Sequence, residues 1–106
     1  MSDVQRDLAS PLQIDVYRDG VITTVTVAGE LDIVTAPGLM GRLLKAADAH
    51  TERLVLDLSG LAFVDVAGAR ALDQTYTLLQ AVCPVILRAP RPSVRRVFGL
   101  TGLMEN

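Results

Sequence analysis

The chain has 106 residues, which predicts a single domain, and half of its residues are hydrophobic, which argues against disorder. The net charge of −2 is unlike that of a nucleic-acid-binding domain, and no apolar run approaches the roughly 20 residues of a membrane span. One cysteine cannot form an internal disulfide, and together with a single histidine it cannot build a standard zinc site. We therefore expect a cytoplasmic protein that binds no nucleic acid, inserts into no membrane and carries neither metal nor cofactor.

The N-terminal part of the chain predicts a flexible tail followed by an antiparallel hairpin. Residues 1–9 are polar and lack the basic start and apolar core of a signal peptide, so we expect a tail there and one domain over residues 10–106. Apolar and polar residues alternate in residues 12–17 and again in residues 21–28, as they do in half-buried strands. Gly20 between them can adopt the positive φ of a tight turn. The exposed edge of this hairpin leaves open a weak pairing between copies of the chain.

The middle of the chain predicts a helix and a buried strand. Thr35 or Ala36 is suited to be the N-cap of the helix, and Pro37 suits its first turn. Apolar residues then recur at helical spacing, which predicts a helix to about His50. At the C-terminus of this helix, His50 is expected to interact favourably with the helix dipole rather than to take part in chemistry. The branched, apolar residues 53–58 predict a third strand. Because a helix connects it to the second strand, the two should be parallel, with a right-handed crossover.

A second helix is predicted over residues 67–81. Asp65 stands just before it, where a carboxylate can accept backbone N–H bonds and meet the positive end of the dipole. Gly68 lies in the first turn and allows another backbone or a partner to come close.

The C-terminal part predicts a short strand and a third helix. Residues 85–88 follow a helix, so this fourth strand should again be parallel. The third helix should begin near Pro92 or Ser93 and end at Gly99 and Gly102. Its expected core-facing residues are Val94, Val97 and Phe98. Four basic residues in this region suit a solvated helix face better than a phosphate site: Arg88, Arg91, Arg95 and Arg96.

The chemistry-bearing residues favour binding over catalysis. The sequence has no recognisable Ser-His-Asp set, Gly-rich phosphate loop or metal-ligand spacing. Glu30, Asp32, Asp57 and Asp65 raise the alternative of a paired-carboxylate site, but their positions at strand ends and before helices are those of cap and turn residues. We therefore expect the protein not to be an enzyme.

Three motifs resemble the STAS domain of the anti-sigma factor antagonists. Asp-Leu-Ser-Gly at residues 57–60, followed by Asp-Val-Ala-Gly at 65–68, is similar to the family's Asp-Leu-Ser-Gly and Asp-Ser-Ser-Gly. Gly-Glu-Leu-Asp at 29–32, with Thr35 near a helix start, is typical of the family, as is the Val-x-x-x-Phe and Gly-Leu pattern within residues 92–103.

The resemblance covers residues 10–103 and implies the STAS fold. This is an α/β fold with a mixed sheet of four to five strands, in which an N-terminal antiparallel hairpin is followed by parallel strands. Its helices pack mainly on one face of the sheet.

The resemblance also implies a docking function. In the family, the Asp-Ser-Ser-Gly helix start and the Gly-Glu-Leu-Asp loop dock onto an anti-sigma factor of the histidine-kinase-like ATPase fold, which frees the sigma factor. Phosphorylation of the first Ser breaks this docking. Here Val66 occupies that position and Ala67 the next, so the resemblance implies an antagonist that is not phosphorylated there. The implied partner-binding residues are Glu30, Asp32, Thr35, Asp65, Val66, Ala67, Gly68 and Ala69.

Two other functions stay open at this point. One is a STAS interaction module of a transporter or of a multi-protein stress-signalling complex. The other is a small-ligand sensor that uses a pocket beside the second helix. The nearest remaining hydroxyl groups, those of Ser59 and Thr35, are expected in a turn and a cap rather than at a phosphorylation site.

Overall fold

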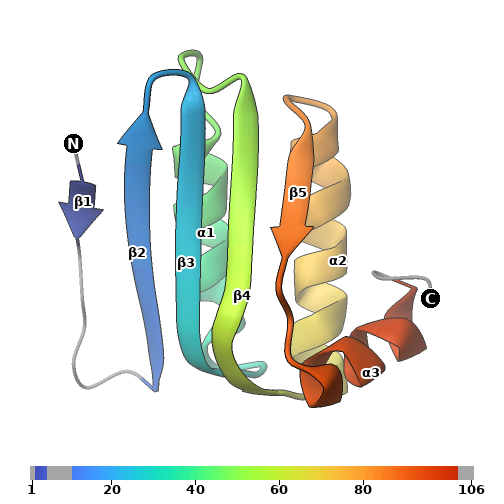
Figure 1. Cartoon of the computed structure of the whole chain (residues 1–106). Coiled ribbons are helices and arrows are strands. Elements are labelled where there is room, and N and C mark those ends of the chain that lie inside the picture. The colour runs from blue at the N-terminus through green and yellow to red at the C-terminus, as the bar shows by residue number, and fades with distance from the viewer. Residues whose placement is uncertain (1, 5–10, 103–106) are drawn as a thin grey trace.

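A computed structural model describes residues 2–4 and 11–102, which form one five-stranded sheet and three helices (Figure 1). In chain order the elements are β1 (Ser2–Val4), β2 (Leu12–Asp19), β3 (Ile22–Leu31), α1 (Ala36–Ala46), β4 (Arg53–Val64), α2 (Val66–Gln80), β5 (Val85–Arg88) and α3 (Pro92–Thr101).

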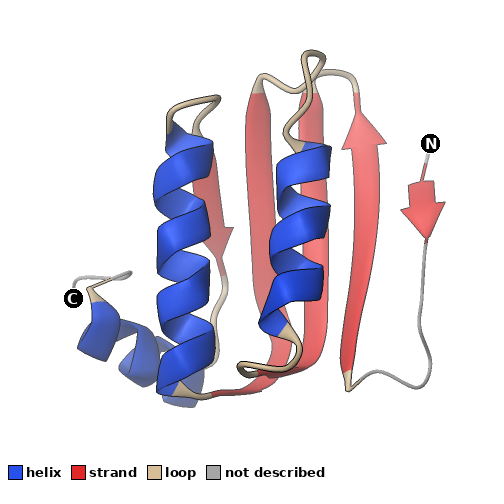
Figure 2. Cartoon of the chain, turned by 180° about the vertical axis from the view of Figure 1, so that it is seen from behind, coloured by secondary structure: helices blue, strands red, loops and turns tan. Residues whose placement is uncertain are grey.

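The strands follow one another across the sheet in chain order, from β1 to β5 (Figure 1). The pairs β1–β2 and β2–β3 are antiparallel, and the pairs β3–β4 and β4–β5 are parallel. Helices α1 and α2 lie side by side on one face of the sheet, and α3 lies beside the N-terminal half of α2 (Figures 1 and 2). The fold class predicted from the sequence is confirmed.

The hairpin of β2 and β3 turns at Gly20, whose φ of 61° is the left-handed conformation expected of it. The second strand of the hairpin continues to Leu31, beyond its predicted end. Within the segment predicted as a tail, the backbone of Ser2–Val4 pairs with residues 15–17 and covers part of the outer edge of β2. The rest of that segment, residues 1 and 5–9, lies outside the described residues.

Helix α1 ends at Ala46, earlier than the predicted end near His50. Ala47 has a ψ of 62°, which takes the chain out of the helix, and the Thr51 hydroxyl donates to the Ala46 carbonyl over 2.9 Å. His50 therefore lies in the turn that follows, where its N–H donates to the Asp48 carboxylate over 2.9 Å. The prediction that His50 ends the helix is wrong because a side-chain hydroxyl and carboxylate stop the helix first.

Two further boundaries differ from the predictions. Strand β4 continues past residue 58, its predicted end, through Ser59 and Gly60, because the missing side chain of Gly60 lets the strand pass Ala28 of β3 closely. Two register shifts between β3 and β4 accompany this extension. In α3, Gly99 lies inside the helix, and the helix ends only at Gly102, whose φ is 85°.

The hydrophobic core lies between the sheet and the helices. On β4, Leu54, Leu56 and Leu58 alternate toward the helices and are almost fully buried. Val94 and Phe98 of α3 are buried as predicted, while Val97 is half-buried. Within the described residues, no helix is both long and apolar enough to cross a bilayer.

Candidate functional site

The first turn of α2 is fixed by its cap. Asp65 has extended backbone angles, and its carboxylate accepts the N–H of Gly68 over 2.7 Å, which satisfies a backbone donor that the helix itself leaves unpaired. The predicted N-cap is confirmed. Val66, the first helical residue, carries its side chain at the surface.

The backbone of this turn also lies in close contact with the end of β3. A Cβ atom added to Gly68 would lie 2.6 Å from the carbonyl oxygen of Leu31, a distance that side-chain carbons do not tolerate. The backbone N–H of Asp65 donates to the same carbonyl oxygen over 3.2 Å. The loop after β3 and the start of α2 therefore form one continuous surface, which the sequence implied only through the resemblance.

The loop between β3 and α1 is held by Asp32 and Thr35. The Asp32 carboxylate accepts the N–H groups of Val34 and Thr35 over 2.9 and 3.0 Å. The Thr35 hydroxyl donates to the Glu30 carbonyl and accepts the N–H of Asp32, both over 2.9 Å. Thr35 occupies the N-cap position of α1, but its hydroxyl closes the loop and makes no capping bond. The carboxylates of Asp32 and Asp65 thus act as turn and cap groups, as expected.

Apolar side chains are exposed at this end of the sheet, on the loop after β3, on β4 and at the start of α2. At the carboxyl ends of β3 and β4, Ile33 is 71% exposed, Val34 81%, Phe63 50% and Val66 40%. Isolated exposed apolar residues are common, but several at one end of a sheet mark a candidate interaction surface. We call Ile33, Val34, Phe63 and Val66 the strand-end surface.

Of the strand-end surface, only Val66 was a predicted site residue. The sequence does carry a usable signal for Ile33 and Val34, since this apolar pair stands in a turn between Asp32 and Thr35, where polar residues are the rule. The exposure of Phe63 has no such signal, because it depends on how β4 ends against β3, where Phe63 pairs with Glu30.

The other predicted partner-binding residues differ in how exposed their side chains are. Glu30 and Ala67 are exposed, and Asp32 and Asp65 are half-buried. Three are buried: Thr35, Gly68 and Ala69. Because Ala69 is fully buried in the core, its role here is packing, and Gly68 and Thr35 shape the surface without forming its exposed part.

A second polar cluster joins β4 to β5 and α3. The Asp57 carboxylate accepts the N–H of Ser59 and a guanidinium N–H of Arg88, each over 2.9 Å, and Arg91 donates to the Ser59 carbonyl over 3.1 Å. Burial raises the pKa of Asp57, but the hydrogen bonds of Ser59 and the bond and charge of Arg88 outweigh it, so the pKa lies below its ordinary value of 3.8.

This cluster corrects the reading of the four arginines. Arg88 lies on β5 and Arg91 just before α3, and both bind β4, so they do not belong to one solvated helix face. Arg95 and Arg96 are exposed on α3. In residues 2–4 and 11–102, no group of three or more His, Cys, Asp or Glu residues gathers where a metal ion could be held.

Taken together, the mixed sheet, the α2 start capped by Asp65 and the loop closed by Thr35 define a STAS domain. The chain belongs to the STAS domain family, whose model matches residues 13–106.

Three solved structures illustrate the relationship. The chain is 31% identical to an anti-sigma factor antagonist from Mycobacterium paratuberculosis, with a TM-score of 0.76 over 93% of this chain and 84% of that one. The anti-sigma factor antagonist SpoIIAA of Bacillus, in its unphosphorylated form, has a TM-score of 0.68 at 22% identity, over 85% and 81% of the chains. A murine anion transporter, Solute Carrier 26 family member A9, has a TM-score of 0.71 at 20% identity, over 81% of this chain and 14% of that one. The last two likenesses show the fold alone, and no curated protein sequence matches the chain.

Proposed function

We propose that the protein is an anti-sigma factor antagonist, and that it docks onto an anti-sigma factor of the histidine-kinase-like ATPase fold and thereby releases a sigma factor. The proposal is supported by the 31% identity to a protein described as such an antagonist. It makes the protein a cytoplasmic binding protein without catalytic activity.

The observation that carries the proposal is the strand-end surface. Its apolar side chains are exposed at the place where the family motifs meet, and burying them against a partner would be favourable. The carboxylates of Asp32 and Asp65 are already engaged by backbone N–H groups, so Glu30 is the freest acidic group of the predicted set.

In this proposal, docking is not controlled by phosphorylation at the motif position. Val66 has no hydroxyl group to accept a phosphate, and its side chain suits an apolar contact. Of the nearest hydroxyls, that of Thr35 is buried and donates to the Glu30 carbonyl, which leaves it unsuited to modification. The protein is then expected to bind its partner constitutively, with control exerted through its amount or at another site.

Val66→Asp tests the proposal. An aspartate at the first position of a helix interacts favourably with the dipole, so the fold is expected to persist. At a partner interface the same carboxylate becomes a desolvated, unpaired charge, which costs about 1–3 kcal/mol or more, or roughly 5- to 150-fold in Kd. The measurement is affinity purification from the lysate of the source organism, followed by titration of the recovered partner.

Leu100→Asp is the matched control, because Leu100 is also an exposed apolar helix residue but lies on α3. Wild type and Leu100→Asp should recover the ATPase, and Val66→Asp should not. Equal recovery by all three proteins would place the interface elsewhere. Recovery of transporter or stress-signalling subunits, with no such ATPase, would replace the proposal by the interaction-module alternative.

A further inference from the structure

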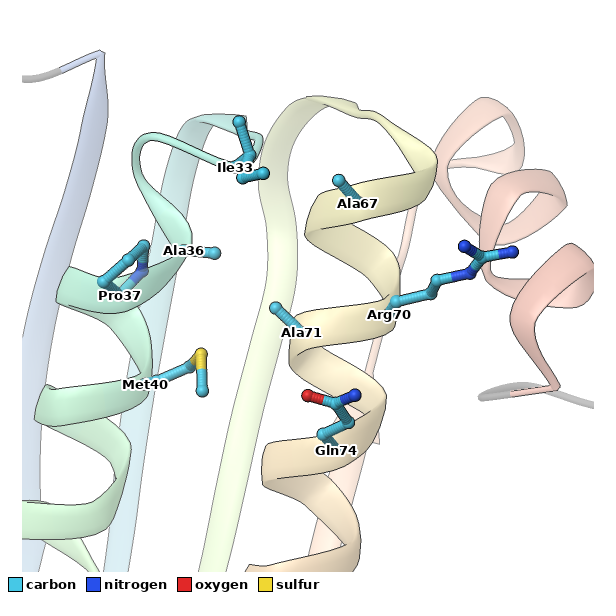
Figure 3. A pocket seen from close by; sticks show the side chains of 8 residues that line it. All are labelled: Ile33, Ala36, Pro37, Met40, Ala67, Arg70, Ala71 and Gln74. Carbon is cyan, nitrogen blue, oxygen red and sulfur yellow. The ribbon is translucent and has the colours of Figure 1, made fainter.

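Helices α1 and α2 leave a groove between their outward faces. Its volume is about 360 Å³. In Figure 3, Met40 projects from α1 toward α2, while Ala71 projects from α2 toward α1. The residues with which α2 lines this part of the groove, Ala67 and Ala71, have small side chains, and they leave the space between the helices unfilled.

The apolar part of the groove lies at the end near the loop after β3. Ile33 and Ala67 lie at that end, and the buried side chain of Ala36 points from α1 toward α2 (Figure 3). At the other end the lining changes to the polar amide of Gln74, and the charged side chain of Arg70 projects away from α1 (Figure 3). Because the apolar part is short, it suits one uncharged side chain better than a long amphipathic segment.

The apolar end of the groove is continuous with the strand-end surface. Ile33 belongs to both, since it lines the groove and its side chain is 71% exposed. Ala67, on the α2 wall, directly follows Val66 in the chain. A partner that covers the strand-end surface therefore also covers the mouth of the groove. A hollow left empty beneath such a contact forfeits van der Waals contacts, so close packing of the interface requires a partner side chain that fills it.

We propose that the partner which docks onto the strand-end surface inserts one aromatic side chain into the α1–α2 groove as its anchor. The inference rests on the proposed function and adds the place and the chemistry of the main contact. Interfaces commonly draw most of their binding energy from a few such side chains seated in desolvated pockets. Met40 favours an aromatic occupant, because a thioether adapts its shape and makes favourable contacts with aromatic rings.

The amino acid derivatives N-acetyl-phenylalanine amide and N-acetyl-tryptophan amide are the probes of the groove itself. The full chain is labelled at its methionine methyl groups, and the NMR signal of Met40 is assigned by its loss in Met40→Leu. The aromatic probes should shift this signal saturably, and N-acetyl-serine amide should not. Ala71→Phe, which fills the groove from within, should abolish the shift. Val66→Asp should leave it unchanged, because Val66 does not line the groove.

Ala71→Phe also tests whether the partner uses the groove. The substitution leaves the strand-end surface unchanged, and the hollow has room for the ring, so urea unfolding should show a stable fold. The partner recovered by the wild-type chain should bind Ala71→Phe at least about tenfold more weakly, because its own anchor is excluded. Ala81→Phe makes the same change at an exposed alanine just after α2 and should bind as wild type does.

A double-mutant cycle identifies the anchor. The aromatic residues of the partner are replaced by alanine one at a time. One replacement should weaken binding to the wild-type chain at least about tenfold and should leave binding to Ala71→Phe nearly unchanged, because both substitutions act on the same contact.

The inference alone fails if Val66→Asp weakens the partner but Ala71→Phe binds it as wild type does, if no aromatic probe shifts the Met40 signal saturably, or if that shift persists in Ala71→Phe. Recovery of a different protein whose binding Val66→Asp weakens overturns the proposed function alone, and Ala71→Phe then decides the inference with that protein. If no recovered protein is weakened by Val66→Asp, both fail.

Two results would assign the groove to another occupant and also overturn the inference. One is a dimer in sedimentation that Ala71→Phe dissociates. The other is a small apolar molecule that native mass spectrometry finds on the wild-type chain, with or without its partner, but not on Ala71→Phe.

Discussion

Gly68 lies where the start of α2 meets the end of β3. It lies in the first turn of α2, where its N–H is bound by the Asp65 carboxylate and its Cα faces the backbone of Leu31. In an ordinary helix position, alanine would be the better residue by about 1 kcal/mol. The glycine is required here by the close approach of two backbones, and so its role is structural and local.

Gly68→Ala should therefore destabilise the protein by about 1–3 kcal/mol, because the new methyl group forces the Leu31 backbone or the start of α2 to move. The free energy of unfolding from urea titration measures this. Gly99→Ala in α3 is the matched control, since a Cβ there meets nothing within 4 Å, and it should be neutral or stabilising by up to about 1 kcal/mol. Equal effects of the two substitutions would contradict the close approach.

At the scale of the elements, the hydrogen bonds around Asp57 and Ser59 connect β4 to β5 and to the start of α3. It lies on β4, receives Arg88 from β5, and binds the Ser59 N–H, while the Ser59 carbonyl is held by Arg91 at the start of α3. The contacts fix how the short strand β5 and the following helix sit against β4. They also make this junction sensitive to acid, because the folded-state pKa of Asp57 is depressed.

Asp57→Asn should cost about 1 kcal/mol near neutral pH, a modest value because the Arg88 side chain is 53% exposed. Since the pKa of Asp57 is lower in the folded than in the unfolded state, the unfolded state takes up the proton first as the pH falls. The Asp57 contribution is thus complete well above pH 3.8 and is lost as the pH falls below 3.8 and through the folded-state pKa.

Urea unfolding of wild type and Asp57→Asn between about pH 3 and 7 measures this dependence. The stability difference should shrink toward the acid end. Glu52→Gln, which removes one carboxylate at an exposed position, controls for net charge. A difference that stays constant down to pH 3 would show that the Asp57 carboxylate is not stabilised by these partners.

At the scale of the whole molecule, α3 completes the core beside α2. It contributes Val94 and Phe98 to the buried cluster, and Phe98 is among the largest side chains with no exposure. Because Val94 and Phe98 are buried in the same core cluster as residues of the sheet and of α2, the last helix is part of the fold and not an appendage.

Phe98→Ala should lower the free energy of unfolding by about 3–5 kcal/mol, through lost burial and the cavity left behind. Thermal and urea unfolding measure the loss. Leu100→Ala, two residues further along the same helix but exposed, should change stability by no more than about 0.5 kcal/mol. A similarly small effect of Phe98→Ala would mean that α3 does not contribute to the core in solution.

The sequence by itself determined the order and type of the elements, from the hairpin to α3, and the roles of Asp65 and Gly68. These features follow from local physics: side-chain periodicity, the carboxylate that caps a helix, and the turn and close-approach positions that need glycine. The identity of the fold also followed from short motifs at the right spacing. Local signals failed where a hydroxyl ended α1 early and where β4 continued through Ser59 and Gly60.

Only the tertiary structure decided which side chains meet. The exposure of Phe63 depends on how β4 ends against β3, and the burial of Ala69 depends on the rotation of α2 against the sheet. The groove between α1 and α2 arises in the same way, from small side chains on neighbouring helices. Such features depend on contacts between residues distant in the chain, so no window of the sequence contains them.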